Sequence, residues 1–146
     1  MAKYLLIVDF QSGPDDAPMS DWSDQEVAEH LNYYGRLNQE LLASGELVGG
    51  EILTGPDLAK VVTSDGSTTV VTDGPFQEFK EWVAGYQIVE TETEERALEI
   101  AALVSAVPGR GGVPTQQPIQ VRRIMDDGPS DVEEMNAFLE TASNPR

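Results

Sequence analysis

Residues Thr72–Glu90 read TDGPFQEFKEWVAGYQIVE and join a tight turn to a strand-like run. Asp-Gly-Pro is typical of a turn, because glycine relaxes the steric limits on the backbone and proline fixes its own φ. The run that follows is rich in aromatic and branched side chains, which predicts a strand over Glu81–Glu90. Alternation places Trp82, Ala84, Tyr86 and Ile88 on one face of this strand and Val83, Gly85, Gln87 and Val89 on the other.

Two polar side chains of this stretch are candidates for chemistry. The Asp73 carboxylate has two interpretations: a cap that accepts from the amide of Phe76, or a catalytic acid–base group. Lys80 lies among Glu78 and Glu81, and acidic neighbours keep an ammonium group charged. We therefore interpret Lys80 either as an anion clamp or as a partner in a surface ion pair.

Periodicity on both sides of this stretch predicts the remaining elements. A helix begins after Ser23, where Ser23 and Glu26 have capping-box spacing, and ends at Gly45. Its expected apolar stripe is Val27, Leu31, Tyr34 and Leu41, and Gly35 inside it suggests a close backbone approach. The other predicted elements are strands over 4–8, 46–53 and 118–125, a hairpin of 59–63 and 68–72 around Asp65-Gly66, and a helix capped by Thr91 or Thr93.

This order of elements predicts one α+β domain over residues 1–125, with a ferredoxin-like antiparallel sheet. Two helices can cover only one face of that sheet, and the other face is also apolar. An uncovered apolar face is adhesive, so we expect two copies to pair face to face as a homodimer. Residues 126–146 form an acidic C-terminal extension with a short amphipathic helix, for which Ser130 and Glu133 have capping-box spacing.

Composition excludes several classes of protein. The net charge is −17, with the cations scattered, so binding to nucleic acid is not expected. No cysteine is present, which rules out disulfides and thiolate metal sites. The longest apolar runs fall short of both a signal peptide and a membrane span, so we expect a cytoplasmic protein that does not enter a membrane.

His30 is the single histidine and shares a helix edge with Glu26 and Tyr34. Histidine is the usual acid–base residue near neutral pH, although a lone helical histidine is also common as a satisfied interior residue. One imidazole without a second imidazole or a thiolate is a poor metal site. The sequence also contains neither a phosphate-binding loop nor a dinucleotide fingerprint, so no metal and no organic cofactor is expected.

The motif residues resemble the YCII-related proteins, in the branch characterised by an Asp-Gly-Pro-Phe (DGPF) motif. The similarity spans Ala2 to about Met125 and rests on Thr72–Phe76, Lys80-Glu81, the strand from Trp82, the opening Lys3-Tyr4, Leu41–Gly45 and Gly49–Glu51. It implies a ferredoxin-like fold paired as a dimeric α/β barrel. The function of this family is largely unassigned, and relatives encoded near extracytoplasmic-function sigma factors imply a link to regulation.

A shorter branch of the same family has a proposed catalytic pair, a histidine on the first helix and an aspartate near the end of the second. Counting back from Gly45 puts that histidine position near Tyr34, one turn after His30, and residues 105–109 contain no aspartate. The pair therefore does not carry over intact to this chain.

These observations give two functional hypotheses. The first is a dimeric protein that binds a small molecule, anionic if Lys80 clamps it, between the sheet and the first helix, with cofactor-free acid–base catalysis by His30 or Asp73 left open. The lining residues expected for that pocket are Tyr4, Tyr34, Phe76, Lys80, Trp82 and Tyr86. The alternative is a non-enzymatic regulatory interaction protein linked to sigma-factor-dependent transcription. Whether the protein is an enzyme stays undecided at this point.

Overall fold

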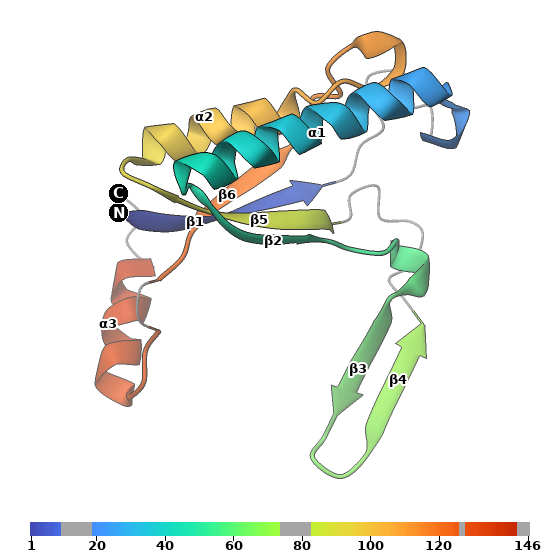
Figure 1. Cartoon of the computed structure of the whole chain (residues 1–146). Coiled ribbons are helices and arrows are strands. Elements are labelled where there is room, and N and C mark those ends of the chain that lie inside the picture. Colours follow the sequence, from blue (N-terminus) through green and yellow to red (C-terminus); the bar gives the residue numbers. More distant parts are fainter. Residues whose placement is uncertain (10–18, 74–82, 126–127, 143–146) are drawn as a thin grey trace.

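The computed structural model describes residues 1–9, 19–73, 83–125 and 128–142. Its main body is a four-stranded antiparallel sheet with two helices, α1 and α2, on one face (Figure 1). The strands are β1 (Ala2–Asp9), β2 (Leu47–Ile52), β3 (Lys60–Ser64), β4 (Thr69–Asp73), β5 (Val83–Thr91) and β6 (Ile119–Arg123). The helices are α1 (Asp24–Ser44), α2 (Glu94–Ser105) and α3 (Val132–Ala142).

The strand order confirms the predicted ferredoxin-like topology. The strands of the sheet lie in the order β2-β5-β1-β6, so the first and third strands of the split β-α-β unit are central. β3 and β4 form a separate two-stranded hairpin between β2 and β5, as the Asp65-Gly66 turn predicted. The Asp65 carboxylate accepts from the amides of Ser67 and Thr68, which fixes this turn.

The strand register decides which side chains face the helices. Gln87 on β5 donates to Asn38 of α1 at 2.8 Å, so Gln87 and the alternating Val89 face the helices. Tyr86 and Ile88 consequently face the other way. On β1 they pair with Ile7 and Leu5, and these four side chains form the centre of an open sheet face.

The core lies between the helices and the inner sheet face. Leu6, Val89, Ile100 and Val104 have no accessible surface there. Burying a side chain of this size stabilises the fold by about 1.5–3 kcal/mol. Tyr4 belongs to the same cluster, together with Leu37, Leu41, Ala97 and Ala101.

Helix α1 has the predicted caps but a different buried stripe. Ser23 and Glu26 make the reciprocal capping box, and Gly45 ends the helix at φ 81°. The inward stripe consists of His30, Leu37 and Leu41, spaced i, i+7 and i+11, with Tyr34 beside it. The prediction that Leu31 belongs to this stripe was wrong, since Leu31 lies about 100° around the helix from His30 and is 62% exposed.

Glycines in β2 and α1 have different surroundings. At Gly50 a Cβ atom would lie 2.7 Å from the carbonyl oxygen of Tyr86, and the register shifts between Leu47 and Gly49, so β2 has a bulge and a close backbone approach there. At Gly35 a Cβ atom would meet nothing within 4 Å, so the predicted close approach there was wrong. Gly35 instead leaves a gap on the outer surface of α1.

An ion pair ties α2 to the start of β2. Thr93, rather than Thr91, caps α2 by accepting from the amide of Arg96. The Arg96 guanidinium donates to both carboxylate oxygens of Glu46, at 2.8 and 3.0 Å. This bidentate geometry lowers the pKa of Glu46, chiefly through the hydrogen bond from Arg96.

The hairpin β3–β4 and helix α3 both project from the body, on the side of the sheet away from α1 and α2 (Figure 1). The cap of α3 lies one residue later than predicted. Asp131 accepts from the amide of Glu134, and the Glu134 carboxylate accepts from the amide of Ser130. The expected Ser130–Glu133 box was therefore wrong by one position, because the longer Asp131 side chain takes the capping role. Across the described ranges, no helix is long and apolar enough to span a membrane.

Candidate functional site

The inward face of α1 carries a buried histidine, His30, toward its N-terminal end. Only 6% of His30 is accessible, although it belongs to a residue type that is often charged. The Nδ1 atom of His30 lies 2.8 Å from the carbonyl oxygen of Pro108, in the segment that follows α2. Since a carbonyl can only accept, Nδ1 carries the proton, and Nε2 keeps the lone pair of the neutral ring.

The segment that holds Pro108 is itself well ordered by backbone hydrogen bonds. Gly109 donates to Val113 at 2.8 Å, Thr115 donates to Val107 at 2.9 Å, and Pro108 forms an isolated β-bridge with Pro114. The acceptor for His30 is thus part of a closed loop. This arrangement sets the orientation of the imidazole from outside α1.

Two aromatic rings flank His30. Its ring centre lies 5.4 Å from that of Trp22 and 5.2 Å from that of Tyr34, both in edge-to-face geometry. Trp22 also packs against Gly109, where a Cβ atom would come within 3.3 Å of the indole ring. We call Trp22, His30, Tyr34 and the Pro108 carbonyl the His30 cluster.

Burial keeps both titratable groups of the His30 cluster neutral. Desolvation lowers the pKa of His30, and the hydrogen bond to Pro108 opposes this only in part. Desolvation also raises the pKa of Tyr34 to about 12, with a smaller contribution from Tyr33. At neutral pH the imidazole is uncharged and the phenol keeps its proton.

The indole N–H of Trp22 is the unusual feature of the cluster. Trp22 is 7% exposed, and its Nε1 atom is buried without a hydrogen-bond partner in the part of the chain that the structure describes. A buried donor in this state costs about 1–3 kcal/mol. Such a cost is often retained where a ligand or an ordered water supplies the acceptor.

Glu26 lies one turn before His30 and has a structural role. Its carboxylate accepts from the amides of Ser23 and Gly111, and both bonds lower its pKa. Glu26 thereby joins the start of α1 to the loop after Pro108. It does not extend the His30 cluster as a proton donor, because a carboxyl group with a lowered pKa is ionised at neutral pH.

The predicted lining residues are distributed over different parts of the molecule. His30 and Tyr34 lie together, and Tyr4 lies in the core beneath the helices. The prediction that Tyr86 lines a pocket under α1 is wrong, because Tyr86 lies on the opposite, open face of the sheet. Phe76, Lys80 and Trp82 fall outside the described residues, as does most of the Asp-Gly-Pro-Phe motif.

Asp73 lies at the end of β4 in the projecting hairpin. Its side chain is 87% exposed and pairs with Lys60, the residue opposite it on β3. Asp73 thus closes the base of the hairpin, and the structure shows no contact between it and His30. Its expected cap on the amide of Phe76 lies outside the described residues.

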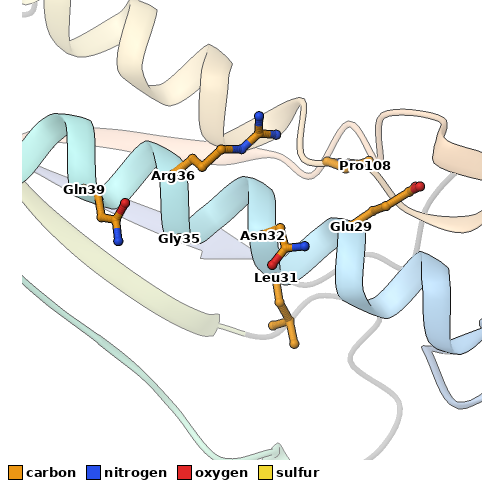
Figure 2. Close-up of a pocket in the computed structure, with 7 residues that line it drawn as sticks. All are labelled: Glu29, Leu31, Asn32, Gly35, Arg36, Gln39 and Pro108. Atoms are coloured by element: carbon orange, nitrogen blue, oxygen red, sulfur yellow. The ribbon is translucent and has the colours of Figure 1, made fainter.

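A surface hollow lies along the outer side of α1 and reaches Pro108. It has a volume of about 660 Å³, is open to solvent, and surrounds the gap left by Gly35 (Figure 2). The residues that line it are Glu29, Leu31, Asn32, Gly35, Arg36, Gln39 and Pro108. Within the described segments, no group of three or more His, Asp or Glu side chains is placed to hold a metal ion.

Trp22 was not among the predicted site residues, although the sequence contained a signal for it. Trp22 immediately precedes the cap Ser23, and an apolar residue at this position commonly packs against the first turns of the helix that follows. This rule places the Trp22 ring at the N-terminal turns of α1. Its contact with Gly109, in contrast, depends on the tertiary fold.

Comparison with known proteins identifies relatives of this chain. The family model of the YCII-related domain matches residues 4–113. A protein of Rhizobium meliloti (strain 1021), described as uncharacterized protein R00369, is 26% identical over 98 residues, which make up 66% of this chain and 79% of that protein. The matched region contains β1 to α2 and every residue of the His30 cluster. The chain therefore belongs to the YCII-related family.

Proposed function

We propose that the protein is a cytoplasmic homodimer that binds a small organic molecule at the His30 cluster. The observation that carries this proposal is the buried Trp22 N–H, which lacks a partner among the described residues. A ligand with a hydrogen-bond acceptor would satisfy this donor and offset the cost of its burial. Ligand sites typically combine apolar or aromatic walls with a few polar groups of this kind.

The polar groups of the cluster indicate the chemistry of the ligand. Trp22 offers a donor, His30 offers an acceptor at Nε2, and Tyr34 offers a hydroxyl that stays protonated. A small aromatic molecule with a carboxamide group matches this set, since its ring packs on aromatic side chains and its carbonyl accepts from Trp22. An anionic ligand is supported only if Lys80, outside the described residues, also reaches the site.

The geometry favours binding over strong catalysis. His30 is neutral and its Nε2 lone pair can accept a proton, which is the requirement for a general base. Its Nδ1 partner, however, is a backbone carbonyl rather than a carboxylate, so the group bonded to Nδ1 brings no negative charge to stabilise the imidazolium that proton transfer would form. Asp73, exposed and paired with Lys60, supplies no such charge in the described structure.

The open sheet face supports the homodimer. Leu5, Ile7, Tyr86 and Ile88 form its centre, on the side without helices, and each keeps part of its surface accessible. A second copy packed sheet against sheet would bury them and complete a dimeric α/β barrel. Light scattering at micromolar concentration tests this assembly, and a mass of one chain would contradict it.

A thermal-shift screen of small aromatic acids and amides tests the ligand site. A ligand present at about 100 times its Kd stabilises the folded protein by about 2.7 kcal/mol, which appears as a higher Tm. Trp22→Phe and Tyr34→Phe remove the proposed donors and should abolish this rise. Tyr86→Phe is the matched control, because it removes the same hydroxyl group from the opposite sheet face; loss of the response in Tyr86→Phe alone would reject the site.

A second candidate is a regulatory interaction protein linked to sigma-factor-dependent transcription. The net charge of −17 favours it, since an acidic surface attracts a basic protein face. The expected partner binds less tightly as salt rises and is captured equally well by the wild type, Lys80→Ala and Trp22→Phe. A ligand response that depends on Trp22, without salt-sensitive capture of any protein, would favour the first proposal.

A further inference from the structure

The hairpin β3–β4 has little to stabilise it within its own chain. Every residue of both strands is exposed, including Val61, Val62, Val70 and Val71. Val62 lies directly opposite Val71, so one face of the hairpin carries a pair of adjacent valines. An isolated two-stranded hairpin is at best marginally stable in water. The exposed valines therefore need a covering surface.

Helix α3, at the other end of the molecule, also has little to stabilise it within its own chain. Val132, Met135 and Phe138 follow one another at spacings of three residues and share one side of the helix. All three are at least 40% exposed. A helix of 11 residues is marginal without tertiary packing.

The two appendages flank the open sheet face. Figure 1 shows the hairpin in green and α3 in red, both on the side away from α1 and α2 and at opposite ends of the sheet. The face between them carries Leu5, Ile7, Tyr86 and Ile88. A partner that covers this face thus meets both appendages as well.

The distribution of charge identifies a second copy as the occupant. The whole chain carries −17, yet residues 61–64 and 69–72 of the hairpin contain no charged side chain, and the charges at its base, Lys60 and Asp73, neutralise each other. A second acidic copy can approach such a surface without placing like charges together. A basic partner would be matched instead by acidic side chains, and the one acidic side chain of these strands, Asp73, is already paired with Lys60.

Symmetry then determines which appendage covers which. If the two-fold axis exchanges the ends of the sheet, each hairpin meets the partner's α3, and both appendages of both protomers are covered. If the axis preserves the ends, α3 meets α3. That arrangement brings together the carboxylates of Glu133, Glu134 and Glu140 from two copies, which repel each other.

We infer that the hairpin of each protomer packs its Val62–Val71 face against the Val132–Met135–Phe138 side of the partner's α3. This clasp rests on the proposed homodimer and adds to it a definite pair of contacts. It gives the C-terminal extension a role in assembly. It also explains why the strands of a surface hairpin in this strongly charged protein carry no charge beyond the Lys60–Asp73 pair.

The absence of native cysteines allows a direct cross-linking test. In the full-length chain, Val71→Cys combined with Phe138→Cys places one thiol on each side of the inferred contact, and a short bismaleimide should convert most of the protein to a covalent dimer. Either single variant should give several-fold less dimer. Val71→Cys with Leu98→Cys is the control, because Leu98 lies on α2 beyond the opposite sheet face.

The outcomes separate the clasp from the homodimer. A monomer by light scattering before cross-linking would reject both. A dimer in which the single variants cross-link as well as the double variant, or in which the double variant gives only a link within one chain, would reject the clasp and leave the homodimer standing. If circular dichroism shows that Val71→Cys is unfolded, Val62→Cys probes the same hairpin face with the same expected result.

Discussion

The imidazole of His30 donates through Nδ1 to the carbonyl oxygen of Pro108 at 2.8 Å, between residues 78 positions apart. This bond joins the first helix to the loop that follows the second helix. It fixes the tautomer of the ring and leaves Nε2 as an acceptor. The orientation of the imidazole and the position of its acceptor atom in the His30 cluster follow from this hydrogen bond.

We expect the stability of the protein to fall as the pH is lowered through 6.5, the ordinary pKa of histidine. Burial lowers the pKa of His30 below its ordinary value of 6.5, so the unfolded chain binds a proton before the folded chain does. Stability therefore rises with pH through the interval between the folded and unfolded pKa values and is fully present above 6.5. Urea denaturation at pH 5.5 and 7.5 measures the difference, and nuclear magnetic resonance follows the single histidine directly.

Two substitutions separate the charge of His30 from its hydrogen bond. His30→Asn keeps a donor for the Pro108 carbonyl but does not titrate, so its stability should be nearly constant over this interval. His30→Phe removes the donor and should cost about 1–3 kcal/mol at pH 7.5, because the carbonyl is left buried without a partner. If His30→Asn keeps the pH dependence of the wild type, His30 is not its source.

Gly35→Ala and Gly45→Ala should change stability in opposite directions. Gly35 lies inside α1 with open space where a Cβ atom would be, so alanine should stabilise the helix by about 0.5–1 kcal/mol. Gly45 ends the helix at φ 81°, where an alanine side chain costs about 1–2 kcal/mol. Midpoints of urea unfolding report both effects. Destabilisation by Gly35→Ala would mean that another chain packs against this glycine.

Arg96→Lys should destabilise the protein by about 0.5–1 kcal/mol. Lysine keeps the charge but cannot donate to both oxygens of Glu46, and part of the effect is lost to solvent because Arg96 is 39% exposed. A double-mutant cycle with Glu46→Gln isolates the coupling between the two side chains. Arg36→Lys, on the outer side of α1, is the control and should fall within about 0.5 kcal/mol of the wild type. Equal losses of stability in Arg96→Lys and Arg36→Lys would show that the bidentate hydrogen bonding of Arg96 to Glu46 is unimportant.

Asp73→Asn should leave stability within about 0.5 kcal/mol of the wild type, since the pair with Lys60 is exposed to solvent. It should also leave the ligand response of the His30 cluster unchanged, because Asp73 lies in the projecting hairpin. Thermal-shift titration with a ligand found in the screen measures both the stability of Asp73→Asn and its response to the ligand. A lost response would restore Asp73 as a site residue.

Prediction from the sequence was most accurate where the determinants are local. The Ser23–Glu26 box, the Gly45 stop and the Asp65-Gly66 turn were all found, because each depends on side chains that bond to backbone a few residues away. The same local logic misplaced the cap of α3 by one residue, because the neighbouring Asp131 is also a capping residue type and accepts from the amide of Glu134.

Prediction was least accurate where the outcome depends on which face of a helix or strand packs against the rest of the fold. Periodicity alone allowed either Leu31 or His30 to define the buried stripe of α1, and the structure buries the polar residue. Helix propensity does not favour burial of His30 over burial of Leu31. Burial of His30 is possible because the carbonyl oxygen of Pro108 accepts a hydrogen bond from its imidazole. The rule that a glycine marks a close approach likewise failed at Gly35, which faces open space, and held at Gly50, where another strand is near.

The sequence by itself determined the elements, their order and hence the ferredoxin-like sheet, because apolar periodicity, caps and turns act over a few residues. It also determined that Tyr86 and Gln87 point to opposite sides of β5, since alternation is a property of any strand. Only the tertiary structure decided that Gln87 faces the helices, that Tyr86 is thereby removed from the expected pocket, and that Trp22, His30 and Tyr34 meet beside Pro108. These contacts join segments far apart in the chain, so they depend on strand register and helix packing, which no local pattern specifies.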